Sequence, residues 1–131
     1  MLTNFSYIRP QTLKEAVKAL ASDGALLHAG GMDLLGCLRD QVSPVTKVVS
    51  ISSLKELKGI RSTPDGGLRI GALTTITEVA ESRVVRENYT ALAQAAQEVA
   101  SPQLRNQGTI GGNLCQKPRC WYYRGEFHCL R

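Results

Sequence analysis

The sequence predicts a chain of mixed helix and sheet, of the α+β class, in which a small α/β unit over residues 1–55 precedes a second unit over residues 56–131. Three observations support this prediction. Strand and helix patterns alternate before residue 55, a hairpin pattern fills residues 60–72, and helix patterns follow at 75–82 and 91–100. The 131 residues, 43% of them hydrophobic, are enough for a globular chain to bury a core of its own.

The first unit begins with a short strand pattern at residues 5–8, which Pro10 ends. Thr12 and Glu15 have the spacing of a capping box, so a helix should start there. Gly24 should end that helix. The apolar residues that share one of its faces are Leu13, Ala16, Val17 and Leu20.

A compact apolar run at residues 25–29 is typical of a buried parallel strand. It leads at its carboxyl end into a first glycine turn, His28 to Asp33, and a short helix is predicted from Asp33 to Arg39. This order of strand, glycine turn and helix aims N–H groups at a phosphate. We expect Asp33 to cap the helix rather than to bind a ligand directly. Residues 47–51 form a further buried strand.

The second unit opens with a predicted antiparallel hairpin, in which residues 60–63 and 68–72 flank a turn at 64–67. Thr75 and Glu78 form a second capping box that starts a short helix to about Ser82. Residues 91–100 are a strong helix candidate, which Ser101-Pro102 should end or kink. The apolar face of this helix consists of Leu92, Ala95, Ala96 and Val99.

A second glycine turn, Gln107 to Leu114, follows as a loop about eighty residues after the first. Each turn has paired glycines beside a short polar residue, so its backbone can approach a ligand closely and direct several N–H groups at one anion. Glycine pairs also mark simple tight turns or helix ends. Neither turn is a Rossmann fingerprint or a P-loop. Two such turns could hold a diphosphate.

Residues 29–35 and 105–114 resemble the two flavin-binding loops in the FAD subunits of molybdenum hydroxylases. That family includes xanthine dehydrogenases, carbon monoxide dehydrogenases, aldehyde oxidoreductases and 4-hydroxybenzoyl-CoA reductase. The resemblance runs from residues 5–7 to residues 68–73 and beyond. It implies a two-lobed FAD-binding domain of the vanillyl-alcohol-oxidase (PCMH) type. The chain would hold the small α/β lobe and the start of a second, antiparallel-sheet lobe, and would be a truncated part of a longer subunit.

In the family both loops meet the FAD diphosphate, so the resemblance implies which residues bind the cofactor here. Met32 departs from the family, where Thr or Ser is usual, so one hydroxyl contact to a phosphate would be missing. Among the expected cofactor-binding residues, the diphosphate contacts are Gly30, Gly31, Thr109, Gly111 and Gly112, with Asn113 closing the second loop. Ala29, Met32, Asp33 and Ile110 are expected to support them from nearby.

Four cysteines form a separate pattern. Cys37 lies alone in the first short helix and is expected to be a small core residue. Cys115, Cys120 and Cys129 crowd into fifteen residues, which favours metal binding over disulfides in a chain without a secretory signal. Unliganded cysteines are one alternative, and a zinc site completed by His128 is another, although adjacent residues would be awkward ligands.

The segment 113–123 resembles the branch of the family whose flavin subunit carries an extra [4Fe–4S] cluster, such as periplasmic aldehyde oxidoreductases and 4-hydroxybenzoyl-CoA reductase. Four thiolates are the usual ligands of such a cluster. The resemblance favours Cys120 and Cys129, and then Cys115, as ligands. At least one more ligand would lie beyond Arg131, so the cluster would be incomplete in this chain.

Hydrolysis would be indicated by paired carboxylates or by a nucleophile with a neighbouring base, and the sequence shows neither. The resemblance implies an oxidoreductase subunit that passes electrons through FAD, with a molybdenum cofactor in a large partner subunit and [2Fe–2S] centres in a small one. NAD, a quinone or ferredoxin would accept the electrons, and the chain alone would be inactive. The alternatives are a non-redox module that binds a nucleotide or another anion, and a zinc-stabilised interaction domain.

Composition bounds location and partners. No stretch reaches the roughly 18 apolar residues that a membrane helix needs, so no membrane span is predicted. A cytoplasmic location is expected, or a periplasmic one if a partner subunit carries the export signal. The net charge of +5 is partly concentrated among the aromatic residues near the end of the chain. This pattern suits a solvated face or an interface as well as a nucleic-acid site, and we expect no nucleic-acid partner.

Overall fold

The structure is a computed structural model that describes residues 2–42, 44–125, 127 and 129. The chain forms two compact units, one of residues 1–54 together with 116–131, and the other of residues 55–115. The sequence-based division placed residues 116–131 with the second unit, whereas the compact units group them with the first. Hydrogen bonds from Lys117 and Arg124 to Asp33, described below, connect this segment to the first unit.

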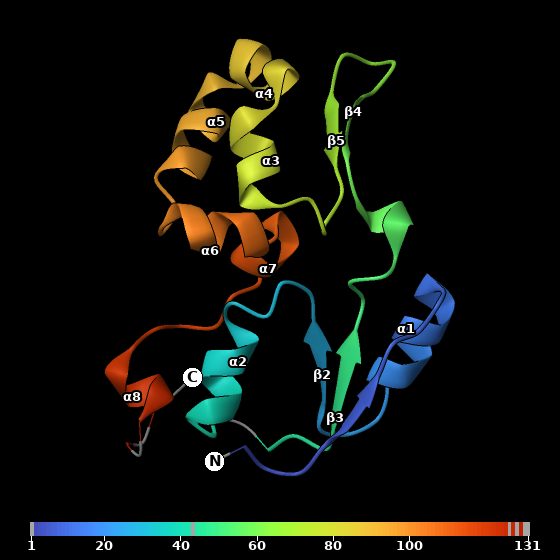
Figure 1. The fold of residues 1–131 in the computed structure, drawn as a ribbon, viewed down its shortest axis with the longest axis vertical. Coiled ribbons are helices and arrows are strands. Elements are labelled where there is room, and N and C mark those ends of the chain that lie inside the picture. Colours follow the sequence, from blue (N-terminus) through green and yellow to red (C-terminus); the bar gives the residue numbers. More distant parts are fainter. Residues whose placement is uncertain (1, 43, 126, 128, 130–131) are drawn as a thin grey trace. The chain divides into compact units, whose positions relative to one another are not determined.

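The first unit is built on a parallel three-stranded sheet with the order β1-β3-β2 (Figure 1). The register pairs Val48 with Tyr7 on one side and with Leu26 on the other. The central strand β3 is buried on both faces, because Val48 and Val49, whose side chains point to opposite faces, are 2% and 0% exposed. The sequence predicted all three strands to within about a residue, and they are β1 (Ser6–Ile8), β2 (Ala25–His28) and β3 (Lys47–Ser50).

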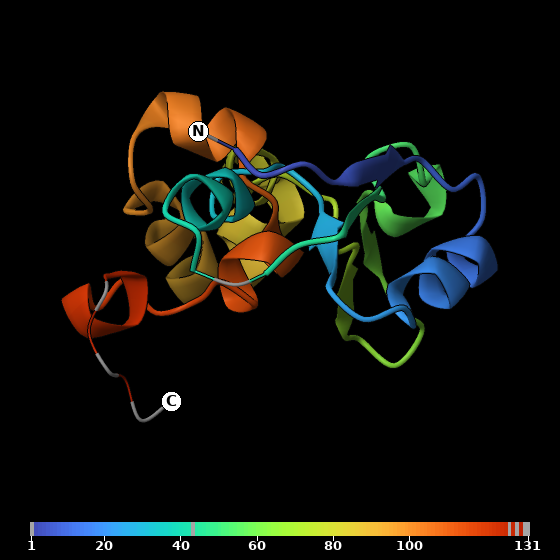
Figure 2. The same ribbon diagram turned by 90° about the horizontal axis from the view of Figure 1, so that it is seen from below.

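Helices α1 (Leu13–Leu20) and α2 (Leu34–Arg39) follow β1 and β2, and Figure 2 shows them on different sides of these strands. The capping box predicted at α1 forms only in part. The Thr12 hydroxyl accepts the Glu15 N–H at 3.2 Å, but the Glu15 carboxylate accepts the N–H of Gln11 rather than that of Thr12. On the predicted apolar face only Ala16 is fully buried.

A short 3₁₀ turn (Lys55–Leu57) opens the second unit and leads into the predicted antiparallel hairpin. Its strands are β4 (Ile60–Ser62) and β5 (Leu68–Ile70), with Ile60 opposite Ile70. The hairpin prediction is confirmed. Isoleucines and leucine of these strands pack on the buried helical core of the unit, which consists of Ile76, Val79, Ala80, Val85, Ala93 and Ala96.

Five helices complete the second unit. The sequence predicted α3 and α5, although α5 ends three residues earlier than expected. It missed α4 and α6, because Ser82 and Ser101 start new helices where the pattern indicated only ends; Ser101 accepts the Leu104 N–H, with Pro102 at the first helical position. The helices are α3 (Ile76–Glu81), α4 (Arg83–Asn88), α5 (Thr90–Gln97), α6 (Pro102–Gln107) and α7 (Ile110–Leu114).

The last helix described, α8 (Trp121–Arg124), belongs to the first unit. Its Trp121 and Tyr122 side chains are exposed. Within the part of the chain that the structure describes, no helix has the length and apolar character needed to cross a membrane.

The capping box at α3 is complete, and it generates a test of the second unit. Thr75 accepts the Glu78 N–H at 3.1 Å, and the Glu78 carboxylate accepts the Thr75 N–H at 2.6 Å. Thr75→Ala should lower the free energy of unfolding by about 1 kcal/mol, because one N–H at the helix start loses its acceptor. Thr75→Ser keeps the hydroxyl and should retain most of the stability. Urea denaturation measures both, and equal midpoints for the two variants would contradict this account.

Candidate functional site

The first glycine turn lies at the carboxyl end of β2, the position where open α/β sheets bind ligands. Gly31 is buried and has φ +79°, a conformation that glycine adopts without strain. A side chain there would also meet the Nε2 atom of His28 at 2.9 Å. The structure therefore requires glycine at this position for two independent reasons.

Backbone polar groups of the first turn divide into engaged carbonyls and open N–H groups. The carbonyl of His28 accepts the N–H of Ile51 at 2.9 Å, and that of Gly31 accepts the N–H of Leu35 at 3.0 Å. By contrast, none of the described residues accepts a hydrogen bond from the N–H groups of residues 30–33. Successive N–H groups that the fold leaves open, beside carbonyls that it fixes, are what an anion-binding turn requires.

The side chain of His28 packs against Gly31 of this turn, a role that the sequence did not predict. Its Nδ1 atom is hydrogen-bonded to the Ser50 hydroxyl at 3.2 Å, and Ser50, completely buried, is hydrogen-bonded to Ser52 at 3.0 Å. The ring of Tyr7 meets the imidazole edge-on. Burial lowers the pKa of His28 below its usual value, because the charged form loses hydration.

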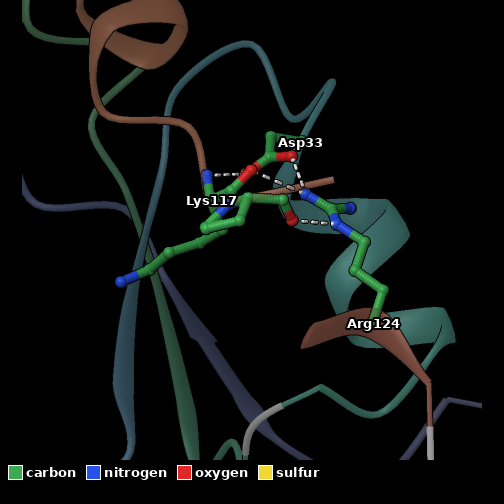
Figure 3. A network of polar contacts seen from close by, with 4 residues as sticks. Asp33, Lys117 and Arg124 are labelled. Carbon is green, nitrogen blue, oxygen red and sulfur yellow. Dashed lines mark hydrogen bonds and ion pairs between the residues drawn. The ribbon is translucent and has the colours of Figure 1, made fainter. Parts of the chain in front are cut away.

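Asp33 does not cap α2, so the sequence-based expectation for it is wrong. It occupies the N-cap position, but its side chain makes no hydrogen bond to the helix. Its Oδ2 atom instead accepts the backbone N–H of Lys117 at 2.9 Å, and its Oδ1 atom accepts Nη2 of Arg124 at 2.5 Å (Figure 3). Burial alone would raise the pKa of Asp33. The two donors outweigh that effect and lower the pKa below its usual value.

The second glycine turn differs from the loop that the sequence predicted. Residues 110–114 form the short helix α7, and Thr109 is its N-cap, with a hydroxyl that accepts the N–H of Gly112 at 3.2 Å. Thr109 is buried and bridges to Thr75 in antiparallel fashion. The paired glycines therefore lie inside a helical turn that is attached to the start of α3.

The N–H groups of this second turn already have partners inside the second unit. That of Ile110 donates to Thr74 at 2.8 Å, that of Gly111 to Ala72 at 3.0 Å and that of Asn113 to Thr109 at 2.8 Å. A Cβ atom at Gly111 would lie 2.9 Å from both the Cβ and the carbonyl oxygen of Ala72. Close packing on residue 72 thus accounts for this glycine without a ligand.

The cysteines divide as expected only in part. Cys37 is 8% exposed in α2, which confirms its prediction as a core residue. Cys115 and Cys120 are exposed, Cys129 is half-buried, and all four are free thiols. Among the residues that the structure describes, no three His, Cys, Asp or Glu side chains are gathered in a way that could hold a metal ion. His128, proposed for a zinc site, lies outside the described residues.

The position of His28 generates a prediction about pH. Its pKa is lowered in the fold from a usual value of 6.5, so the unfolded chain takes up this proton first as pH falls. The contribution of neutral His28 to stability is therefore complete above the usual value and is lost as pH falls below it. Between about pH 7.5 and about pH 5.5, wild type should lose slightly more stability than His28→Gln. Thermal melts at both pH values measure this, and parallel losses would contradict it.

The comparisons with known proteins agree with the geometry of the first turn. The model of the family "FAD binding domain in molybdopterin dehydrogenase" matches residues 3–120. The chain is 42% identical over 111 residues to a xanthine dehydrogenase FAD-binding subunit of Escherichia coli O157:H7, covering 84% of this chain and 38% of that protein. It is 41% identical over 120 residues to the aldehyde oxidoreductase FAD-binding subunit PaoB of Escherichia coli K12, covering 91% and 37% respectively.

Solved structures give the same result. A chain of carbon monoxide dehydrogenase from Hydrogenophaga pseudoflava superposes with a TM-score of 0.81 at 35% identity, over 87% of this chain and 40% of that one. Quinoline 2-oxidoreductase from Pseudomonas putida 86 also gives 0.81, at 31% identity and the same coverage. The chain thus spans about two fifths of the length of the proteins it matches. It belongs to the family of FAD-binding domains found in molybdopterin dehydrogenases.

Proposed function

We propose that this chain binds FAD and serves as the flavin-binding part of a molybdenum-dependent hydroxylase or dehydrogenase. The observation that carries the proposal is the first glycine turn, where the fold leaves the N–H groups of residues 30–33 open to a ligand. The family supports FAD as that ligand. Its diphosphate is the anionic group that such a turn would hold. The two units would correspond to the two lobes of a vanillyl-alcohol-oxidase-type domain.

The first turn would contribute Ala29, Gly30, Gly31, Met32 and the backbone of Asp33 to the cofactor. The second turn would contribute through residues 109–113, but in a different way. The N–H groups of residues 110–113 are all bonded inside the second unit, so contact to the cofactor there would come from other atoms of residues 109–113. Bound FAD would supply the redox chemistry, and the chain would supply position.

Relatives of this chain are subunits of dehydrogenases and oxidoreductases, which supports an oxidoreductase assignment for the complete protein. In that assignment a large partner subunit holds the molybdenum cofactor and a small one holds [2Fe–2S] centres. Bound FAD would supply electron transfer between these centres and an external acceptor, which would be NAD, a quinone or ferredoxin. The cytoplasm is the proposed location, with the periplasm as the alternative.

Met32 offers a matched test of the flavin site. Met32→Thr supplies the hydroxyl that the family usually carries, and should tighten FAD binding by about fivefold if it adds one hydrogen bond of about 1 kcal/mol to a phosphate oxygen. Met32→Val has nearly the same shape without the hydroxyl and should give no such gain. Titration of FAD into the full chain, followed by flavin fluorescence, measures the affinities.

Two results of this titration would contradict the proposal. If the wild-type chain binds no FAD under any condition in which its circular dichroism is native, the flavin assignment fails. If Met32→Val tightens binding as much as Met32→Thr, the turn does not contact the phosphate through residue 32. Binding of ADP by a chain that binds no FAD would instead indicate a non-redox nucleotide module.

We also propose that Cys120 and Cys129, with Cys115, contribute ligands to a [4Fe–4S] cluster. The support is their free thiols, of which two are exposed, and the cations Lys117, Arg119 and Arg124 nearby in the sequence, which would balance an anionic cluster. In the structure the three thiols are not gathered into one group, so residues 115–129 would have to rearrange when iron binds.

Cys120→Ser should abolish stoichiometric iron binding, because a hydroxyl is a poor replacement for the thiolate that would bind an iron of the cluster. Cys37→Ala, at a buried cysteine of α2, is the matched control and should leave iron content unchanged. Iron and zinc per chain are measured by metal analysis after anaerobic reconstitution of the chain extended by the downstream residues that would supply the remaining ligand. Equal iron in wild type and in Cys120→Ser would exclude Cys120 as a ligand, and zinc in place of iron would favour an interaction domain.

A further inference from the structure

The segment between Cys115 and α8 has no regular secondary structure, yet several of its backbone polar groups have partners. The N–H of Lys117 donates to the Asp33 carboxylate. The carbonyl of Lys117 accepts Nη2 of Arg124 at 3.2 Å, and the carbonyl of Pro118 accepts Nε of Arg124 at 2.8 Å. Figure 3 shows the guanidinium facing these acceptors and Asp33 together. One arginine therefore closes residues 117–124 into a compact turn.

The same arginine fixes the backbone beside Cys120. The N–H of Arg124 donates to the carbonyl of Cys120 at 3.0 Å, which forms the single turn of α8. The Nη1 atom of Arg124 also lies close to Gly36 of α2, 3.4 Å from where a Cβ atom would stand. The position of the cysteine-bearing segment relative to α2 thus depends on the contacts that fix the Arg124 guanidinium.

Asp33 holds it. The side chains of Arg124 and Asp33 are only 18% and 19% exposed, whereas those of the surface pair Arg83 and Glu87 are 88% and 57% exposed. A pair mostly withdrawn from water is less screened and orders its neighbours more firmly than an exposed pair does. Both carboxylate oxygens of Asp33 are occupied by these contacts.

From this geometry we infer that Asp33 is a positioning residue for the cysteine-bearing segment 116–124 and that its carboxylate does not contact the flavin. The part of this inference that concerns flavin rests on the function proposed above. An anionic carboxylate is also a poor neighbour for a diphosphate, and its engagement with Lys117 and Arg124 directs it away from that task. The backbone of Asp33 ends the first glycine turn while its side chain anchors the segment, so one residue connects the two.

Hydrogen exchange of the Lys117 amide tests the positioning role directly, because that N–H donates to Asp33. In NMR experiments on the full chain without flavin, Asp33→Ala should speed this exchange by about tenfold or more, as expected for the loss of a hydrogen bond to a charged group. Arg124→Met should have a similar effect on the same amide. The double variant should add little, because both substitutions remove one interaction. Asp33→Glu restores a carboxylate and should recover part of the protection.

Lys117→Met is the matched control. Figure 3 shows the Lys117 amine pointing away from Asp33, so this variant removes a cation but keeps the bonded N–H, and its residue-117 amide should stay protected. Amides of β3 report whether each variant keeps its fold. If Asp33→Ala does not fold, Arg124→Met alone carries the test. Unchanged exchange of the Lys117 amide in the folded variants would overturn the inference.

FAD titration of the same variants tests the second half. Asp33→Ala and Arg124→Met should bind FAD alike, with any change in affinity shared by both. If Asp33→Ala weakens FAD binding by tenfold while Arg124→Met binds normally, Asp33 is a flavin contact and the inference is wrong. If no variant and no wild-type chain binds FAD, the proposed function fails, whereas the exchange rates still decide whether Asp33 positions the segment.

Discussion

Pairing of β2 with the central strand β3 is the interaction on which the first unit depends. The register that sets His28 beside Ser50 also determines where β2 ends and the first glycine turn begins. Beyond the last ladder pair, the N–H of Ile51 still donates to the carbonyl of His28, so the entry to the turn is fixed from the neighbouring strand. The buried hydroxyl of Ser50 is hydrogen-bonded to the imidazole of His28, and this ring lies directly against Gly31. These contacts fix the position of the turn. Its N–H groups can therefore stay unbonded instead of turning inward to bond with the rest of the fold.

The two glycine turns look equivalent in the sequence and differ in the structure. Both have paired glycines beside a short polar residue. In the first, positive φ at Gly31 turns the backbone so that carbonyls bond inward and N–H groups do not. In the second, Thr109 starts a helical turn whose N–H groups are bonded to residues 72, 74 and 109. Glycine there permits close backbone packing on Ala72. The same residue type thus serves an open ligand turn in one unit and internal packing in the other.

Much of the fold could be predicted from the sequence because its determinants are local. The three strands of the first unit, the hairpin and the capping box at Thr75 each depend on residues within a few positions of one another. Helices α4 and α6 were missed because each is short and, unlike α3, has no capping box in the sequence; such helices are stabilised chiefly by packing against α3 and α5. The sequence identified the first glycine turn but could not show the partner of Asp33, which lies far along the chain. Nothing in the sequence indicated the role of His28, since its partners Ser50 and Tyr7 come from the strands β3 and β1.

Asp33 and Arg124 are 91 positions apart, and in the sequence the whole second unit, residues 55–115, separates the two parts of the first. Their contact therefore closes a very long loop, whose entropic cost is reduced when residues 55–115 have already folded and shortened the effective span. During synthesis, residues 116–124 leave the ribosome only after the second unit has emerged. The second unit can therefore fold before the last segment of the first unit is available. Until then α2 exposes to solvent the surface that Arg124 later covers, and a ribosome stalled before residue 116 would hold a first unit that is still incomplete.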